Sequence, residues 1–268
     1  MRPRTHSHLS SARSTQHHAG RHELGQNFLT HRPTVARITR LVAETRGPIL
    51  ELGAGDGAIT LALDRLNRSV DAIDIDSRRV ADLQRRVRRA TVRRSDALRE
   101  PLDVPVVVGN IPFHLTTPIL RRLLSTGSWQ HAVLLTQWEV ARKRAGVGGG
   151  TMLTAQSLPW FEVRLDSRVP ASAFRPRPAV DGGILVIQRR STPLVSPADR
   201  RAYERFVAGV FTGPGRGLRS ALGQASARSR ADVDRALRRL RIPSATAPGR
   251  LTAEQWAELW RALHGRTA

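Results

Sequence analysis

The feature that most constrains the fold is a short apolar run that ends in a glycine-rich loop. The segment Pro48-Ile-Leu-Glu-Leu52 has the composition of a buried strand, and Gly53-Ala-Gly-Asp-Gly57 follows it directly. A helical period of apolar residues then resumes over 58–66. Glycines at positions 53 and 55 allow backbone conformations and a close approach that a Cβ atom would block. This order predicts a strand–loop–helix unit whose turn lies against a nucleotide-like ligand.

Strand and helix patterns alternate through most of the chain, which predicts an α/β fold. The expected strands cover residues 48–52, 69–75, 91–95, 104–109, 131–136, 161–168 and 183–189. The expected helices cover residues 33–46, 58–66, 77–89, 116–126 and 151–159. Strands that alternate with helices at this spacing imply a parallel sheet that binds its ligand at the carboxyl ends of the strands.

The two ends of the chain have no strand pattern. After a Ser- and Pro-containing linker at 191–197, residues 198–265 place apolar residues at helical spacing among many arginines, which predicts a small helical lobe. Residues 1–22 hold four arginines, five histidines and no acid, and they predict a flexible basic tail. A metal site in this tail is the alternative, but the histidine spacings match no recognisable ligand pattern.

The charge balance points to a polyanionic partner. The chain carries 44 basic and 22 acidic residues, a formal net charge of +22, and Lys143 is its only lysine. Such a surplus predicts binding to nucleic acid or to an anionic membrane surface. Arginine suits phosphate because its planar guanidinium binds bidentately and also stacks on bases. A GC-rich genome could explain arginine in place of lysine, but it does not explain the twofold excess of cations over acids.

Several kinds of protein are excluded by what the sequence lacks. The chain has no cysteine, which excludes disulfides, thiolate metal ligands and a cysteine nucleophile. No stretch of about 18 residues is free of charge, so no membrane span is expected. The polar N-terminus is unlike a secretory signal, because it has no apolar stretch. We expect a cytoplasmic protein that is monomeric and has no metal site.

Acidic residues beside the glycine loop distinguish between two nucleotide-like ligands. The pattern Gly-x-Gly-x-x-Ala also fits a relaxed dinucleotide fingerprint, which is a weak signal alone. NAD would place its pyrophosphate at the helix N-terminus, where it would face both Glu51 and Asp56. S-adenosylmethionine has no phosphate and carries a sulfonium and an ammonium group, so these acids favour it. The alternative for Asp56 is a residue selected for its turn preference.

A further acid stands at the end of the next strand. Asp74 follows the loop by about 20 residues, where an acid can accept hydrogen bonds from both ribose hydroxyls. Asp76 is the competing candidate, because a residue two positions along a strand faces the same side. An ordinary acid at a strand end is the structural alternative. We select Asp74 for the ribose.

The segment Asn110-Ile-Pro-Phe113 follows a strand and so lies beside the glycine loop. These residue types suit transfer to an exocyclic amino group on a base, whose lone pair is delocalised into the ring. The Asn110 side-chain oxygen and the Ile111 carbonyl would accept its two N–H groups and direct the lone pair toward the methyl group. Pro112 stiffens the turn, and Phe113 offers a flat face for an extruded base. Alternatively, Asn110 caps a turn and Phe113 lies in the core.

These motifs resemble those of the ribosomal-RNA adenine N6-methyltransferases, which include the Erm macrolide-resistance enzymes and the KsgA dimethyladenosine transferases. The resemblance runs from about Gly25 to Arg190. The segments that carry it are Gly25–Leu29, Glu51–Gly57, Asp74, Ser95–Ala97, Asn110–Phe113 and Phe174–Asp181. It implies S-adenosylmethionine as cofactor. It also implies a seven-stranded Rossmann-like class I methyltransferase sheet with a small C-terminal helical domain.

The resemblance also implies roles for single residues. Asn27 and Leu29 would contact the methionine part of the cofactor, and Asp96 would read its adenine amino group. The expected cofactor-binding residues are Gln26, Asn27, Leu29, Gly53, Gly55, Asp74, Asp96, Ala97 and Asn110. The expected catalytic residues are Asn110, Ile111, Pro112 and Phe113.

Within the family, the sequence is more similar to the Erm branch. Ile111, Phe113 and the segment Gln137–Lys143 carry this similarity, whereas the KsgA branch usually has Leu and Tyr in the catalytic motif. The implied target is one adenine of 23S rRNA in the peptidyl-transferase region, whose N6 methylation blocks macrolide, lincosamide and streptogramin B binding. A KsgA-like enzyme acting on 16S rRNA and a non-catalytic RNA-binding factor on the same fold stay open.

The expected organisation is a basic tail over 1–22, a cofactor-binding catalytic domain over 23–190 and a helical RNA-binding domain over 198–265. The arginine-rich segment after Asp76 is a candidate RNA surface by charge alone. A solvated helix face is an equally good interpretation of these charges. The candidate RNA-binding residues are Arg85, Arg86, Arg88 and Arg89.

Overall fold

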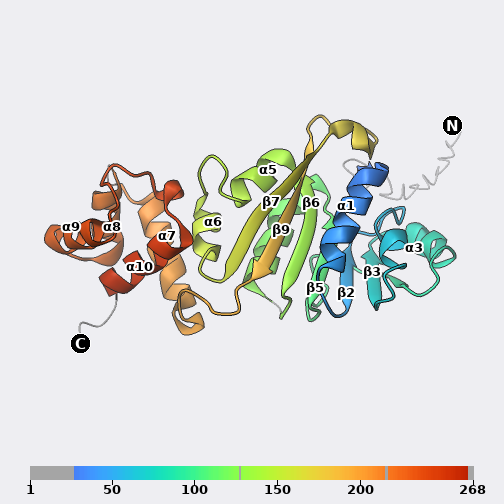
Figure 1. The fold of residues 1–268 in the computed structure, drawn as a ribbon, viewed down its shortest axis with the longest axis horizontal. Helices are drawn as coiled ribbons and strands as arrows, with labels where there is room; N and C mark the ends of the chain where they lie inside the picture. Colours follow the sequence, from blue (N-terminus) through green and yellow to red (C-terminus); the bar gives the residue numbers. More distant parts are fainter. Residues whose placement is uncertain (1–26, 127, 215–216, 265–268) are drawn as a thin grey trace, which may run out of the picture.

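A mixed sheet forms the centre of the structure, a computed structural model that describes residues 27–126, 128–214 and 217–264. Over these residues the sheet has seven strands in the order β4-β3-β2-β5-β6-β9-β7 (Figure 1). The strands are β2 (Ile49–Leu52), β3 (Val70–Asp74), β4 (Thr91–Arg94), β5 (Val106–Asn110), β6 (His131–Gln137), β7 (Phe161–Val169) and β9 (Gly182–Arg189). The predicted α/β class and the seven-stranded sheet are confirmed.

The direction of one strand differs from the prediction of a parallel sheet. The neighbours from β4 to β6 are parallel, but β9 runs antiparallel to both β6 and β7. A parallel connection needs a crossover, usually a helix. The chain between β7 and β9 instead contains only a short 3₁₀ turn (Ala171–Ala173) and the strand β8 (Phe174–Arg175). β9 therefore returns beside β7 in the opposite direction.

Helices cover both faces of the sheet because its central strands are apolar on both sides. Val106 of β5 faces a core that contains α1 (Arg32–Ala43) and α2 (Thr60–Leu63). The next residue, Val107, faces the opposite core, which contains α4 (Thr116–Ser125). In Figure 1, α1 crosses in front of β2 and β5. This arrangement leaves the carboxyl ends of the central strands open for a ligand.

The helix α3 (Ser77–Gln84) is shorter than the periodicity predicts. The expectation of a helix over 77–89 is wrong because an acid from another element redirects the chain. The Asp64 carboxylate accepts hydrogen bonds from the backbone N–H groups of residues 88–90, at 2.8, 2.9 and 2.6 Å. These contacts hold the segment after α3 against the end of α2.

A small second sheet was not predicted from the sequence. β1 (Phe28–Leu29) pairs antiparallel with β8, with Phe28 opposite Arg175 and Leu29 opposite Phe174. The Thr30 N–H extends the pairing by donating to the Ala173 carbonyl at 2.9 Å. The pairing joins the segment before α1 to the segment before β9, across most of the sequence.

The C-terminal helices share one hydrophobic core with the sheet. They are α7 (Arg200–Thr212), α8 (Leu218–Ser226), α9 (Arg230–Arg239) and α10 (Ala253–His264), and they lie beyond α6 (Met152–Ser157) in Figure 1. Tyr203 of α7 packs edge-on against Trp160 at 5.4 Å and Trp260 at 5.8 Å between ring centroids, and its hydroxyl donates to the Ala155 carbonyl at 2.9 Å. The same core reaches β5 and β6.

The described part of the chain contains neither a membrane-spanning helix nor a metal-binding cluster of side chains. Within it, no helix combines the length and the apolar character needed to span a membrane. No group of three or more His, Cys, Asp or Glu side chains there is arranged to hold a metal ion.

Candidate active site

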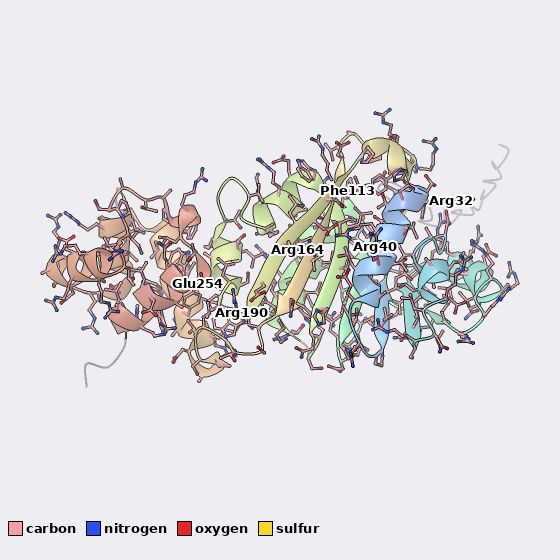
Figure 2. The ribbon with its side chains drawn as sticks, viewed as in Figure 1. Arg32, Arg40, Phe113, Arg164, Arg190 and Glu254 are labelled. Atoms are coloured by element: carbon pink, nitrogen blue, oxygen red, sulfur yellow. The ribbon has the colours of Figure 1, made fainter. Side chains whose placement is uncertain are left out.

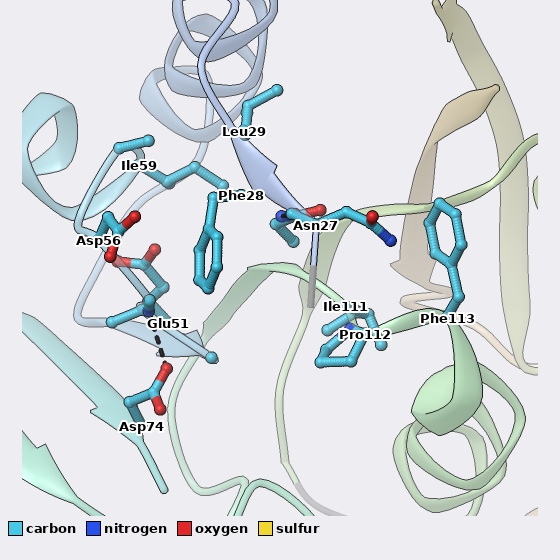
Figure 3. Close-up of a pocket in the computed structure, with 15 residues that line it drawn as sticks. Asn27, Phe28, Leu29, Glu51, Asp56, Ile59, Asp74, Ile111, Pro112 and Phe113 are labelled. Atoms are coloured by element: carbon cyan, nitrogen blue, oxygen red, sulfur yellow. Dashed lines mark hydrogen bonds between the residues drawn. The ribbon is translucent and has the colours of Figure 1, made fainter. Parts of the chain in front are cut away.

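A cavity opens where β2, β3 and β5 end, at the carboxyl edge of the sheet. Figure 3 shows Asp74 and Phe113 on opposite sides of this cavity, with Phe28 between them. A second cavity of about 220 Å³ adjoins it, and both are lined by Gly53, Asp74 and Pro112. The residues that line the first cavity are Asn27, Phe28, Leu29, Glu51, Gly53, Ala54, Gly55, Asp56, Ala58, Ile59, Asp74, Asn110, Ile111, Pro112 and Phe113.

The glycine loop forms one wall of the first cavity and is tied to β3. Gly53 and Gly55 have φ angles of +75° and +53°, in the left-handed region that favours glycine. The N–H groups of Gly53 and Ala54 both donate to the Ile73 carbonyl at 2.9 Å. A Cβ atom on Gly55 would lie only 3.2 Å from the Phe28 ring. The loop therefore needs glycine for its conformation and for its contact with β1.

Asp74 is the last residue of β3, and its carboxylate holds the glycine loop through a hydrogen bond. Its side chain is 7% exposed, and its two oxygens accept hydrogen bonds from the Gly55 N–H at 2.8 Å and the Asp76 N–H at 2.9 Å. Asp76 has a different task, because its carboxylate caps α3 by accepting from the Arg78 N–H at 2.8 Å. Of the two competing acids, Asp74 lines both cavities and Asp76 lines neither.

Glu51 is the most deeply buried acid of the cavity. Its side chain is 1% exposed and accepts a hydrogen bond from the Thr60 hydroxyl at 2.6 Å. Burial raises the pKa of Glu51 to about 8, and the neighbouring charge of Asp74 also raises it. The site thus contains a carboxyl group that a cationic ligand would convert to its charged form.

Asn110 faces the same cavity, and only the nitrogen of its side-chain amide has a hydrogen-bond partner among the described residues. Its side-chain nitrogen donates to the Asn27 carbonyl at 2.8 Å. Among the described residues, its side-chain oxygen has no hydrogen-bond partner. The backbone turns immediately after it, and the Ile111 N–H donates to the Leu135 carbonyl of β6 at 2.9 Å. The Asn110 oxygen is therefore available to accept a hydrogen bond from a ligand.

Phe113 is half-buried and lines the cavity, so it is not sealed in the core. Its ring meets the ring of Phe174 edge-on, with centroids 6.4 Å apart and planes at 71°. Phe174 is fully buried and pairs with Leu29 through β1 and β8. This packing fixes the edge of the Phe113 ring and leaves the ring at the cavity wall. The sequence points to the segment Phe174–Asp181 but assigns Phe174 itself no role.

The segment after β4 lines the second cavity. Asp96 and Ala97 lie there with apolar neighbours that include Ile75, Leu98 and Leu115. The Asp96 carboxylate accepts a hydrogen bond from the Leu98 N–H at 2.8 Å, which fixes the acid at the cavity wall. A mainly apolar cavity with Asp96 at its wall suits a purine whose amino group donates to that acid.

The structure thus distributes the expected cofactor residues over two adjoining cavities. Asn27, Leu29, Gly53, Gly55 and the Asn110 segment line the first, and Asp96 and Ala97 line the second. Gln26 lies outside the described residues.

Phe28 and two charged neighbours form a contact that the sequence analysis missed. The Arg79 guanidinium lies over the Phe28 ring, 4.1 Å from its centroid, and forms an ion pair with Asp56. The ring therefore lies between the glycine loop and a cation. The large aromatic residue in the segment Gly25–Leu29, together with Asp56 in the glycine loop, was the available signal.

The four candidate RNA-binding arginines line neither of the two active-site cavities. Arg85 is paired with Asp82, Arg86 donates to the Asp56 carbonyl at 2.9 Å, and Arg89 donates to the Asn67 side chain. Arg88 is exposed. Their contact with RNA stays a prediction.

The side chains of the first cavity suit a cationic ligand better than a dinucleotide. Among the described residues that line it are three acids, Glu51, Asp56 and Asp74, and no Lys, Arg or His. A pyrophosphate there would face the Asp74 carboxylate with no cation among the described lining residues, whereas a sulfonium and an ammonium group would be attracted. These residues therefore fit S-adenosylmethionine.

The strand order, the glycine loop after β2 and the Asn-Ile-Pro-Phe segment at the end of β5 define a class I methyltransferase. Residues 17–263 match the ribosomal RNA adenine dimethylase family, and the chain belongs to it. The mycinamicin-resistance protein MyrB of Micromonospora griseorubida is 50% identical over 95% of this chain and 82% of its own length. An rRNA adenine N-6-methyltransferase of Corynebacterium diphtheriae is 51% identical over 74% of this chain and 80% of its own.

A solved structure supports the same placement. The crystal structure of the 23S rRNA methyltransferase ErmE superposes with a TM-score of 0.80 at 32% identity, over 88% of this chain and 99% of that one. The similarity therefore includes the C-terminal helices as well as the sheet.

Proposed function

We propose that this protein transfers a methyl group from S-adenosylmethionine to N6 of one adenine in the peptidyl-transferase region of 23S rRNA. The observation that carries the proposal is the position of Asn110 and Phe113 at an acid-lined cavity. The similarity to MyrB and to ErmE, named for drug resistance and for 23S rRNA, supports the substrate. The methylated ribosome would resist macrolide, lincosamide and streptogramin B antibiotics.

Residues of both cavities would hold the cofactor, which supplies a methyl group activated by a sulfonium sulfur. Asp74 would accept hydrogen bonds from the ribose hydroxyls, and Asp96 would accept one from the adenine amino group. Asn27 and Leu29 would contact the methionine part. Gly53, Gly55 and Ala97 would pack against the cofactor, and Gln26 completes the proposed set.

Asn110 and Ile111 would orient the amino group that receives the methyl. The Asn110 oxygen and the Ile111 carbonyl would accept its two N–H groups, so that the nitrogen lone pair is less delocalised into the ring and is directed toward the methyl group. Such alignment is the main catalytic contribution when the donor is already activated. As the new N–C bond forms and the S–C bond breaks, the amine loses one N–H proton. Neither an amide nor a carbonyl is basic enough to keep that proton, so it passes to water.

Pro112 and Phe113 would hold the base itself. Pro112 has no N–H that could compete for the Asn110 oxygen, and its ring restricts the backbone of the turn. Phe113 would stack on the extruded adenine, and Phe174 would keep the Phe113 ring from rotating away.

The remaining parts of the chain have proposed roles that follow from the RNA substrate. We place the catalytic domain at 23–190 and an RNA-binding helical domain at 198–265. The predicted basic tail at 1–22 lies outside the residues that the structure describes. We also propose that the protein acts in the cytoplasm, as a monomer and without a metal ion.

Primer extension on 23S rRNA tests the substrate directly. RNA from cells with and without the gene is compared, and a stop at one adenine only in the expressing cells is expected. Purified protein should also label protein-free 23S RNA with methyl groups. Labelling confined to assembled 30S particles would instead identify a small-subunit enzyme and overturn the proposal.

The variant Asn110→Ala separates catalysis from RNA binding. We expect it to abolish methyl transfer while calorimetry still detects S-adenosylmethionine binding, because Asn110 acts on the acceptor. A fully resistant phenotype in cells that carry this variant would indicate a non-catalytic RNA-binding factor.

A further inference from the structure

An open groove runs between α1 and the segment that contains α2. It has a volume of about 870 Å³ and a mainly apolar floor that includes Val35, Ala62 and Leu66. Leu29 and Ala58 line both this groove and the first cavity of the active site. The groove therefore begins beside the site and leads away from it along α1.

Three arginines without acidic partners line this groove. Arg32 and Arg40 extend from α1, and Arg65 extends from the opposite side. All three are exposed, and within the described residues none of their guanidinium groups has a hydrogen bond or an ion pair. Figure 2 shows Arg32 at one end of α1 and Arg40 further along it. Eight residues of helix place them about 12 Å apart along the axis.

The basic surface continues past Arg65 into a neighbouring depression. Arg65 and Leu61 line both depressions, and Arg86, Arg88 and Arg89 line the second. Asp64 is its one acid among the described residues. The three backbone hydrogen bonds that this carboxylate accepts lower its pKa, and they occupy the oxygens that could otherwise pair with the arginines.

We infer that the α1–α2 groove binds a single-stranded segment of the substrate RNA adjoining the target adenine. Arg32, Arg40 and Arg65 would contact its phosphates, and the apolar floor would contact its sugars and bases. The inference rests on the proposed function. An extruded base must remain joined to its neighbours, and this arginine-lined groove meets the active-site cavity at Leu29 and Ala58.

Charge argues against two other occupants of the groove. Residues 1–22 contain four arginines and five histidines without an acid, so they share the sign of the groove. A second copy of the chain carries the same net charge of +22. A polyanion is the complementary partner, and its phosphates would release counterions on binding.

Charge reversal tests the inference with a matched control. The variants Arg40→Glu and Arg65→Glu should each raise the KM for 23S RNA by about tenfold or more, and should lower the slope of log affinity against log salt by about one. kcat and the affinity for S-adenosylmethionine should not change. Arg46→Glu is the control, because Arg46 is exposed and stands before β2 at the amino edge of the sheet. An unchanged KM in both groove variants would overturn the inference.

A second measurement does not depend on charge reversal. Because the chain has no cysteine, Ala36→Cys introduces one thiol into the groove, and Ser125→Cys introduces one at the end of α4 as a control. Protein-free 23S RNA should slow alkylation of the thiol at position 36 and not of the one at 125. Equal rates with and without RNA at position 36 would overturn the inference. If the same protein still methylates the RNA, the proposed function stands and only the groove is excluded.

Discussion

The amide of Asn110 has two ends with different tasks. The side-chain nitrogen of Asn110 donates to the Asn27 carbonyl at 2.8 Å, which fixes the rotamer. The side-chain oxygen remains free to accept a hydrogen bond from the adenine amino group that receives the methyl. The contact joins the end of β5 to the residue before β1. A substitution that moves Asn27 would therefore disturb the orientation of Asn110 as well as the cofactor side of the cavity.

Phe113→Ala should weaken base binding by about 1–3 kcal/mol, because a stacking face is lost. The ring already lies at the cavity wall, and Phe174 would remain buried behind it. We expect kcat/KM for RNA to fall while calorimetry detects normal S-adenosylmethionine binding. Phe113→Tyr keeps the flat face and is the control. Unchanged kinetics for the alanine variant would show that Phe113 serves only packing.

Glu51 should make the stability of the ligand-free protein depend on pH. Its pKa is raised from 4.5 to about 8, so between these values the unfolded chain binds fewer protons at this group than the folded protein does. The free energy of unfolding should therefore fall as pH rises, by up to about 1.4 kcal/mol per pH unit from this group. Urea unfolding from pH 5 to 8 should show a smaller fall for Glu51→Gln, which keeps an acceptor for Thr60. The same pH dependence of the free energy of unfolding in wild type and Glu51→Gln would contradict the raised pKa of Glu51.

At the scale of elements, α1 is joined to the far edge of the sheet by one ion pair. Asp166 is the extra residue of a bulge in β7, and its side chain is 1% exposed. It accepts hydrogen bonds from the Arg37 Nε of α1 at 2.8 Å and from Arg164 at 2.8 Å. α1 begins just after β1, so this ion pair also helps to hold the wall of the active site.

Asp166→Asn should destabilise the protein at neutral pH. The Arg37 hydrogen bonds hold the pKa of Asp166 at about 2, below its usual value of 3.8. Its contribution is therefore complete above pH 3.8 and is lost as the pH falls through about 2. Urea unfolding should show a gap between wild type and variant at pH 7 that narrows below pH 4. Asp103→Asn, at an exposed loop position, should leave the unfolding midpoint unchanged. A gap that stays constant at low pH would contradict the role of the charge.

The hydrophobic pattern of the sequence predicted those helices and strands that depend on neighbouring residues in the sequence. The run 104–109 and the motif after it could be placed at the sheet edge because a parallel strand, its loop and its helix are consecutive in sequence. α3 ends where it does because Asp64 accepts hydrogen bonds from residues 88–90, and no periodicity contains that contact. The pairing of β1 with β8 was missed for the same reason, since each strand has two residues and the partners are distant in sequence.

For the whole molecule, the shared core predicts that the sheet and the C-terminal helices unfold together. Tyr203 of α7 lies between Trp160 and Trp260, and the same core continues to β5. Thermal unfolding followed by tryptophan fluorescence and by far-ultraviolet circular dichroism should give coincident single transitions. Tryptophans lie on both sides of the junction, at 160 and 260, so the two signals report on both parts. Two separated transitions would show that the helices fold independently.

The antiparallel pairing of β1 with β8 affects when the active site can form during synthesis of the chain. Leu29 leaves the ribosome among the first residues, yet its partner Phe174 is synthesised only after six strands of the main sheet. A nascent chain that ends before Phe174 lacks the residue that supports Phe113, so its acceptor pocket has one wall missing. The order of synthesis thus delays completion of the pocket until six of the seven strands of the main sheet have been made.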